Sequence, residues 1–394
     1  MPNIVDYVIW RGDLTFEKCP FNEIDNLIFS QLSYVDFAGI VSEDADKTIT
    51  LREASKLFWE GKDNASVLKD YPINGKRAIF MRQAAKSARF GDILLSGYVD
   101  LVDVNTETQM SAVQFRLPDD TVYVAFRGTD ATIVGWKEDF NLSYMTQTAG
   151  QRSAVDYMKR YFDRTSLRLR VGGHSKGGNF AVYASAFSGA KVQKQIEVIY
   201  SNDGPGFRQE VVEKPQFQQI IERTVSIVPE DTIIGALLNP IKAKFVVKSS
   251  EDGLMQHDAF TWQVLGPRFE TTTRSKESLF VEKTVAGWLD EVDDESREMF
   301  VDQIFAFIQA SGAKKLVDLK SFKEISSILR AARDLPKEDQ EQFKDVLTQL
   351  VKSGGRTLED SLREAWETRQ GNRESKKKSA NTSAKEGSHE RAMG

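Results

Sequence analysis

A glycine-rich segment in the middle of the chain contains a single serine. GHSKG, residues 173–177, fits the pattern G-x-S-x-G and lies between an apolar alternating run and a helix-forming run. Between a strand and a helix this pattern is typical of a nucleophile elbow, in which flanking glycines permit a tight turn and the serine Oγ projects from it. The helix that follows directs its free amides to the same place, so the Lys176 amide could bind an oxyanion. Ser175 is therefore the candidate nucleophile.

A serine hydroxyl is a weak nucleophile until a base removes its proton, and histidine is the usual base. The chain contains three histidines. His174 is adjacent to the serine, where we expect its side chain to point elsewhere, and His389 belongs to a polar tail. His257 remains, and it follows Ser175 in the chain, as the order serine, acid, histidine of α/β-hydrolases requires. We therefore predict that His257 is the general base.

Two aspartates between the serine and His257 directly follow an apolar run and could orient the base. They are Asp203, in YSNDGPGF, and Asp231, in VSIVPEDTIIG. Asp231 follows the later run, where this fold order usually places the acid, and it precedes the apolar IIGALLNPI. The prediction is that Asp231 accepts the His257 N–H and stabilises the imidazolium. Asp203, beside GPG, is the alternative and is expected to shape a turn, whereas Asp258 is too near His257 in the chain.

A second motif closes an earlier apolar run. VYVAFRGTD, residues 122–130, ends in F-R-G-T about 45 residues before the serine motif, and it resembles the class 3 lipase family of α/β-hydrolases, which act on acyl esters. The residue after R-G lines the oxyanion hole in that family, so the resemblance implies this role for Thr129. The catalytic acid of that family lies in a D-x-[VI]-P-like stretch. The segment of this chain around Asp231 reads V-P-E-D-T-I-I and departs from that pattern. We expect Arg127 to be structural, pairing with Asp130 or Asp139 to hold the loop.

The wider pattern is similar to an uncharacterised group of bacterial lipase-like proteins, found largely in Gram-positive species. The resemblance covers about residues 3 to 350. It implies the fold and the triad but no particular substrate. It rests on D-Y-x-x-W, FNEIDNLIFSQLSYVDF, YSNDGPGF and VVKSSEDGLMQHDAFTW.

The periodicity of the apolar residues predicts the elements that must position these groups. Helical spacing dominates residues 1–95, and alternation over 93–128, with a turn at 118–120, predicts a hairpin that feeds a sheet. Strands that alternate with helices beyond this point indicate an α/β fold with a mostly parallel sheet. The predicted elements are helices at 148–164 and 176–188 and strands at 167–172, 196–202 and 223–229.

The character of the chain changes towards the C-terminus. After about residue 275 the apolar residues recur with a period near 3.6, which predicts a helical extension, and the last residues are polar and predicted to be disordered. We therefore divide the chain into an α/β-hydrolase domain over 1–272, a helical region over 273–370 and a tail over 371–394.

Composition excludes several classes of function. The 394 residues carry a formal net charge of −5, so nucleic acid is not expected as a partner, and there is no long apolar run of membrane-spanning length. Composition gives no support to a membrane-surface role. The acidic N-terminus does not resemble a secretory signal, and the single cysteine, Cys19, fits a reducing compartment. We predict a cytoplasmic protein, and neither a metal nor an organic cofactor is expected.

Together these features predict a serine hydrolase that cleaves a small-molecule acyl ester or lipid through an acyl-enzyme. A thioesterase or lysophospholipase would use the same groups. The alternative from another class is a non-catalytic binding protein on a hydrolase fold, with the C-terminal helices as its interaction surface.

Overall fold

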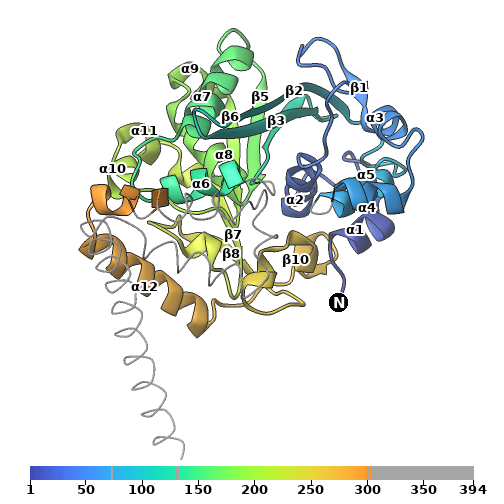
Figure 1. Ribbon diagram of the computed structural model, residues 1–394. Coiled ribbons are helices and arrows are strands. Elements are labelled where there is room, and N and C mark those ends of the chain that lie inside the picture. Colours follow the sequence, from blue (N-terminus) through green and yellow to red (C-terminus); the bar gives the residue numbers. More distant parts are fainter. Residues whose placement is uncertain (72–73, 130–132, 300, 303–394) are drawn as a thin grey trace, which may run out of the picture.

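The computed structural model describes residues 1–71, 74–129, 133–299 and 301–302 (Figure 1). Within these ranges an eight-stranded sheet runs in the order β1 to β8, and a two-stranded sheet joins β9 to β10. Strands β1 to β4 pair antiparallel, and β4 to β8 pair parallel. The strands are β1 Ile49–Thr50, β2 Leu94–Asp103, β3 Thr108–Arg116, β4 Thr121–Phe126, β5 Arg168–His174, β6 Ile196–Asn202, β7 Thr224–Pro229, β8 Ala243–Val247, β9 Val264–Leu265 and β10 Arg268–Phe269.

Helices cover both faces of the large sheet (Figure 1). Because successive parallel strands are neighbours in the sheet, right-handed crossovers place all the connecting helices on one face. That face is covered chiefly by α7 and α8, and the opposite face by the N-terminal helices. The helices are α1 Ile4–Arg11, α2 Glu23–Leu32, α3 Leu51–Phe58, α4 Asn64–Asp70, α5 Gly75–Ala84, α6 Ile133–Asn141, α7 Ala149–Phe162, α8 Lys176–Phe187, α9 Ala190–Gln195, α10 Gln209–Val212, α11 Pro215–Gln218 and α12 Lys276–Glu291, with short 3₁₀ turns η1 Ile221–Arg223, η2 Ile234–Ala236, η3 Gly253–His257 and η4 Ala259–Thr261.

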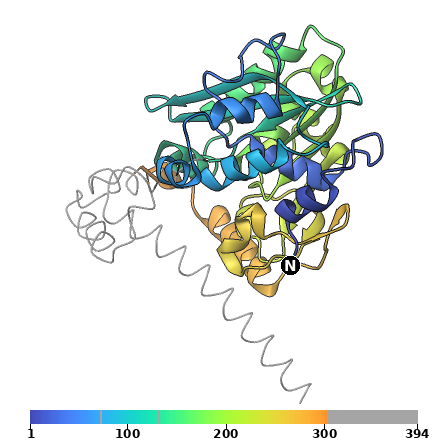
Figure 2. The ribbon, with the colours of Figure 1, turned by 90° about the vertical axis from the view of Figure 1, so that its right-hand side faces the viewer.

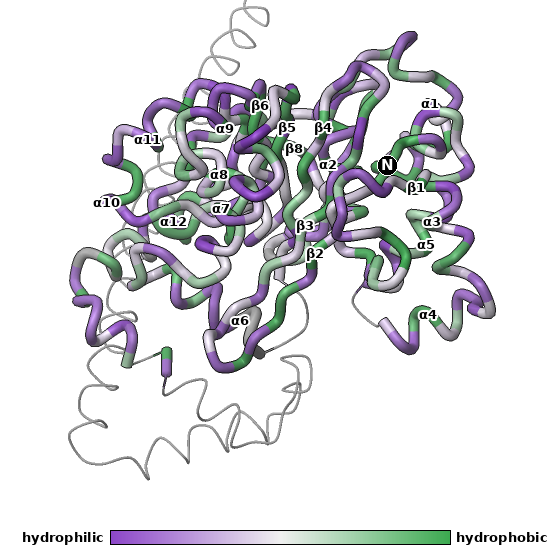
Figure 3. Tube along the Cα trace, turned by 90° about the horizontal axis from the view of Figure 1, so that it is seen from above, coloured by the Kyte–Doolittle hydropathy of each residue, from purple (hydrophilic) through white to green (hydrophobic). Residues whose placement is uncertain are grey.

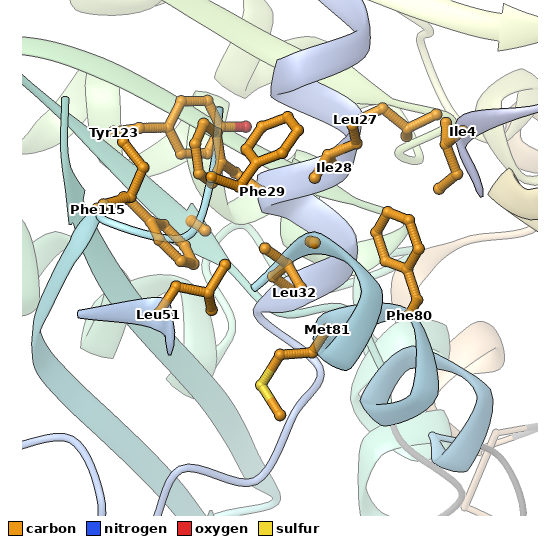
Figure 4. Close-up of a cluster of buried hydrophobic side chains, with 14 of the residues drawn as sticks. Ile4, Leu27, Ile28, Phe29, Leu32, Leu51, Phe80, Met81, Phe115 and Tyr123 are labelled. Carbon is orange, nitrogen blue, oxygen red and sulfur yellow. The ribbon is translucent and has the colours of Figure 1, made fainter. Parts of the chain in front are cut away.

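Each face of the sheet has its own hydrophobic core. Side chains alternate across a strand, so Tyr123 and Ala125 of β4 face the N-terminal helices while Val122, Val124 and Phe126 face α7 and α8. Figure 4 shows the first core, in which Phe29 of α2 lies beside Phe115 and Tyr123 of the sheet. The N-terminal helices therefore bury the face of the sheet that the crossovers leave open.

The N-terminus lies close to a segment from much later in the chain. Val264 N donates a hydrogen bond of 2.9 Å to Pro2 O, so the N-terminus packs beside β9 (Figure 2). Outer helices are amphipathic: along α3, hydrophilic and hydrophobic residues interchange in Figure 3, and Leu51 and Phe58 are buried. In the part of the chain that the structure describes, no helix combines the length and apolar character needed to cross a membrane.

The structure confirms the predicted fold class, a mostly parallel sheet with flanking helices in an α/β-hydrolase arrangement, and a helical lead-in before residue 95. The predicted helices and strands between residues 148 and 229 are present within a few residues of their predicted ends. One hairpin was predicted in this region, and the structure has two in succession, formed by β2, β3 and β4. Helix α6 and strand β8 were not predicted. The first helix after residue 275 is α12, whereas the proposed tail and most of the proposed helical region lie outside the described residues.

Candidate active site

The predicted nucleophile lies in a sharp turn at the carboxyl end of β5. Ser175 has φ 60° and ψ −135°, a strained conformation for a residue with a side chain, and α8 begins at the next residue. The turn depends on its glycines, because a Cβ on Gly173 would lie 2.3 Å from the carbonyl carbon of Gly177. A Cβ on Gly177 would lie 2.2 Å from Phe126 O. The local geometry is that of a nucleophile elbow.

The predicted base is paired with an aspartate, and that aspartate is Asp203. His257 Nδ1 and Asp203 Oδ2 are 2.6 Å apart. The histidine side chain is 26% exposed, while the aspartate side chain is buried. The preference for Asp231 as the partner of His257 is therefore wrong, and the alternative that we ranked second is the one that the geometry supports.

The position of Asp203 at the end of β6 explains the pairing. Strand β6 is the direct neighbour of β5, and Ser175 N donates to Asn202 O at 2.9 Å, so the two strand ends lie side by side. Asp203 has φ 49°, which bends the chain as the turn prediction required and leaves its carboxylate at this edge of the sheet. Its second oxygen, Oδ1, accepts from the Thr232 hydroxyl and from Gly235 N. The carboxylate is therefore fixed on both oxygens.

Asp231 supports the segment that carries the histidine. Its Oδ2 accepts from Gly253 N at 3.1 Å and from Gln256 Nε2 at 2.9 Å, and its own amide donates to Gln256 Oε1. These bonds bind the end of β7 to η3, which ends at His257. Asp231 thus contacts the loop of the histidine and not its ring.

The neighbouring histidine, His174, is buried and occupied at both ring nitrogens. Its Nε2 is 2.8 Å from His257 O, and its Nδ1 is 3.0 Å from the Tyr34 hydroxyl. Burial of the ring holds the pKa of His174 well below its usual value, and the nearby His257 lowers it further. The ring is therefore neutral. A neutral ring with a proton on Nε2 donates to the His257 carbonyl and accepts from Tyr34. His174 therefore positions the backbone of His257.

The loop that carries Thr129 lies against the serine turn. A Cβ on Gly128 would be 3.1 Å from the Ser175 Cβ and 2.5 Å from His174 O, so the backbone passes very close to the elbow. Thr129 Oγ1 donates to Asp139 Oδ2 of α6 at 2.5 Å. Thr129 therefore lies beside the serine with its side chain oriented by α6.

The charged groups around this loop differ from those predicted. Arg127 forms two hydrogen bonds to Asp100 of β2, at 2.9 and 3.0 Å, so the prediction that it pairs with Asp130 or Asp139 is corrected. Its structural role in holding the loop is retained. Burial raises the pKa of Asp139 to about 6, although Lys176 and the Thr129 hydroxyl both oppose the rise. Asp139 is therefore ionised above about pH 6.

The side chain of Lys176 turns away from the serine into the protein. Its Nζ is 3.1 Å from Glu138 Oε2 and 2.9 Å from Gln109 Oε1, and the side chains of Lys176 and Glu138 are each 1% exposed. Glu138 also accepts from the Thr148 hydroxyl and from the amides of Gln109 and Gly150. Lys176 is the first residue of α8, so its amide lies at the N-terminus of this helix, directly after Ser175.

The structure therefore packs Gly128, the residue before Thr129, against the serine turn, and it places the His257 loop beside the same turn through His174. Among the described residues, Ser175 Oγ and the His257 ring share no hydrogen bond. Such contacts are often long without substrate and tighten when it binds.

Sequence reasoning missed Glu138 and named Asp139 only as a possible partner of Arg127, and both residues lie on the helix that was not predicted. They follow an F-R-G-T motif closely, and consecutive acidic residues at that point were the available signal. The signal for Asp203 was its place directly after a strongly apolar strand. Of the three histidines, His389 lies outside the described residues.

Comparison with solved structures finds several lipases among the proteins to which this chain is similar. The M37 lipase is 14% identical, with a TM-score of 0.34, over 56% of this chain and 70% of its own. The lipase from Rhizopus microsporus var. chinensis is 16% identical, with a TM-score of 0.34, over 65% of this chain and 80% of its own. The Rhizomucor miehei lipase in its propeptide complex is 17% identical, with a TM-score of 0.32, over 61% of this chain and 80% of its own.

No curated protein matches the chain in sequence. The family model described as Mbeg1-like matches residues 84–306, which is more than half of the chain and includes the serine turn, both aspartates and His257. The chain belongs to the Mbeg1-like family.

Proposed function

We propose that this protein is a serine hydrolase that cleaves acyl esters through a Ser175–His257–Asp203 triad. The observation that carries the proposal is the 2.6 Å contact between His257 Nδ1 and the buried Asp203, at the sheet edge where Ser175 occupies a strained turn. A structural turn would not need a partly exposed serine, a buried acid and a histidine at one edge. A candidate nucleophile beside a histidine that is paired with a buried acid is the arrangement expected of a catalytic site.

In the proposed reaction Asp203 accepts a hydrogen bond from His257 Nδ1–H, which keeps the proton on Nδ1 and leaves Nε2 free to act as base. His257 takes the proton of Ser175 as Oγ attacks the acyl carbonyl. The tetrahedral oxyanion is bound by the main-chain amides of Lys176 and Thr129, because the one proton of the Thr129 hydroxyl is already donated to Asp139. The imidazolium then protonates the leaving alcohol, and water releases the acid from the acyl-enzyme by the same steps.

An acyl ester or lipid is the substrate class that fits the surroundings of the site. Met255, on the segment of His257, is 63% exposed, and Phe140, next to Asp139, is 45% exposed. Both would contact an acyl chain that leads away from the serine. The proposal includes thioesters, because the same groups would cleave them.

Treatment of the purified full-length chain with a fluorophosphonate probe tests the proposal. We expect covalent labelling of Ser175, located by peptide mass spectrometry, and turnover of short p-nitrophenyl esters. A folded protein that is not labelled would favour the non-catalytic binding protein instead. A panel of esters and thioesters of increasing acyl length then defines the substrate.

Substitution of Thr129 by valine should lower kcat by about 10²-fold with little change in KM. The valine keeps the main-chain amide but loses the bond from Oγ1 to Asp139 that holds this amide in place, and a misplacement of about 1 Å near reacting atoms costs roughly 10²-fold in rate. Thr129→Ser keeps the hydroxyl that donates to Asp139 and is the matched control, with activity close to that of the wild type. Equal activity of the valine and serine variants would show that the bond to Asp139 does not position the oxyanion site.

A further inference from the structure

Helix α6 carries two consecutive carboxylates, each connected to one of the two proposed oxyanion groups. Glu138 contacts the ammonium of Lys176, the residue whose amide is one of them. Asp139 accepts a hydrogen bond from the hydroxyl of Thr129, the residue that supplies the other oxyanion group. The two groups come from segments about 47 residues apart in the chain, and α6 contacts both.

We propose that the buried Lys176–Glu138 ion pair is a positioning device for the oxyanion site. The pair fixes α6 against the start of α8, and Asp139 on the same helix then fixes Thr129. The separation of the two oxyanion groups is thus set by one helix. This inference rests on the proposed function, since it concerns the same reaction.

The first connection is rigid because every charged atom in it has several partners. The Lys176 ammonium contacts Gln109 of β3 as well as Glu138. The Glu138 carboxylate accepts from Gly150 N at 2.6 Å and from the Thr148 hydroxyl at 3.0 Å, at the first turn of α7. One buried pair therefore joins β3, α6, α7 and α8 directly beneath the serine turn.

The second connection is short and directional. The Thr129–Asp139 bond is 2.5 Å, and Asp139 Oδ1 is 3.9 Å from the Lys176 ammonium. Movement of α6 would therefore change the place of Thr129 relative to the Lys176 amide. A misplacement of about 1 Å near reacting atoms costs roughly 10²-fold in rate.

The energetics of buried ion pairs argue for a role beyond stability. Removing two opposite charges from water costs about as much as their attraction returns, so a neutral pair of similar shape would hold the fold equally well. Lys176 and Glu138 nevertheless have side chains that are 1% exposed. A fixed geometry at the oxyanion site is a function that a neutral, less directional pair would not supply.

The test is the double variant Lys176→Met/Glu138→Gln, compared with the wild type on one p-nitrophenyl ester. It removes both charges together, keeps the main-chain amide of residue 176, and leaves an oxygen at residue 138 for Gly150 and Thr148. We expect kcat to fall about 10- to 10²-fold, KM to change little, and the inhibition constant of a trifluoromethyl ketone to rise by the same factor as kcat falls. A purely structural pair would change the melting temperature without this split between kcat and KM.

Two further variants complete the design. Lys137→Met removes two ion pairs of α6 that do not involve Lys176, those to Glu107 and Asp302, and should leave kcat unchanged. Adding Thr129→Val to the double variant should lower kcat by far less than the loss of about 10²-fold expected in the wild type. The two effects overlap because the double variant and Thr129→Val both act on the position of Thr129.

A labelled, folded double variant with wild-type kcat and inhibitor affinity would overturn the inference while leaving the proposed function intact. Absence of Ser175 labelling in the wild type would instead overturn the proposed function. If the double variant does not fold, the connection between Thr129 and Asp139 provides the test of the inference. Asp139→Asn and Thr129→Val should then be non-additive in kcat, and fully additive effects would overturn the inference.

Discussion

Replacement of Ser175 by alanine should reduce turnover of an acyl ester by about 10⁴-fold or more. The substitution removes only Oγ and cannot relieve the backbone strain at φ 60°, because alanine also has a Cβ. The oxyanion groups remain in place, so some catalysis above the rate in water is retained. Steady-state kinetics, together with loss of fluorophosphonate labelling, measures the effect.

Ser185→Ala is the matched control for this variant. Ser185 lies later on α8 and is buried, and its hydroxyl donates to the Ala181 carbonyl of the same helix. We expect full labelling and near wild-type turnover. Retention of activity by the Ser175 variant, with a circular dichroism spectrum like that of the wild type, would refute the proposed mechanism.

Asp203→Asn should reduce kcat by about 10⁴-fold, while Asp231→Asn should reduce it by about 10-fold or less. An amide at residue 203 would place a donor against His257 Nδ1, so the proton would move to Nε2 and the ring could not accept the serine proton. Asp231 contacts only the loop of the histidine, through Gly253 and Gln256. Loss of one oxygen there loosens η3 but leaves the ring tautomer unchanged.

The two aspartates are therefore a matched pair, similar in chemistry and both within reach of the loop that ends at His257. The kcat values of both variants, measured on one ester at a pH above 7, decide between them. A larger loss in the Asp231 variant would show that the acid is Asp231 and that the observed pairing is not the catalytic one.

Several predictions from the sequence stay predictions. The division of the chain at residues 272 and 370 is one, since 303–394 lie outside the described residues. The cytoplasmic location and the expectation of a reaction without metal or cofactor are others. Each depends on composition, and no contact in the fold bears on it.

The sequence by itself determined the elements whose signal is local. Alternating apolar residues predicted β5, β6 and β7, and glycine spacing predicted the turn at Ser175, because strand period and tight-turn sterics act within a few residues. Local patterns also limited the choice of acid to Asp203 or Asp231. They could not decide between them, since both follow an apolar strand.

The tertiary structure decided which side chains meet. Sheet order puts the end of β6 next to the end of β5, and the positive φ of Asp203 leaves its carboxylate facing His257. Asp231 follows β7, one strand further from β5, and its carboxylate is occupied by the loop amides. The connection from Lys176 through α6 to Thr129 likewise depends on how separate segments pack. Spacing along the chain says which residues are available, whereas distance and direction between them exist only once the sheet has formed.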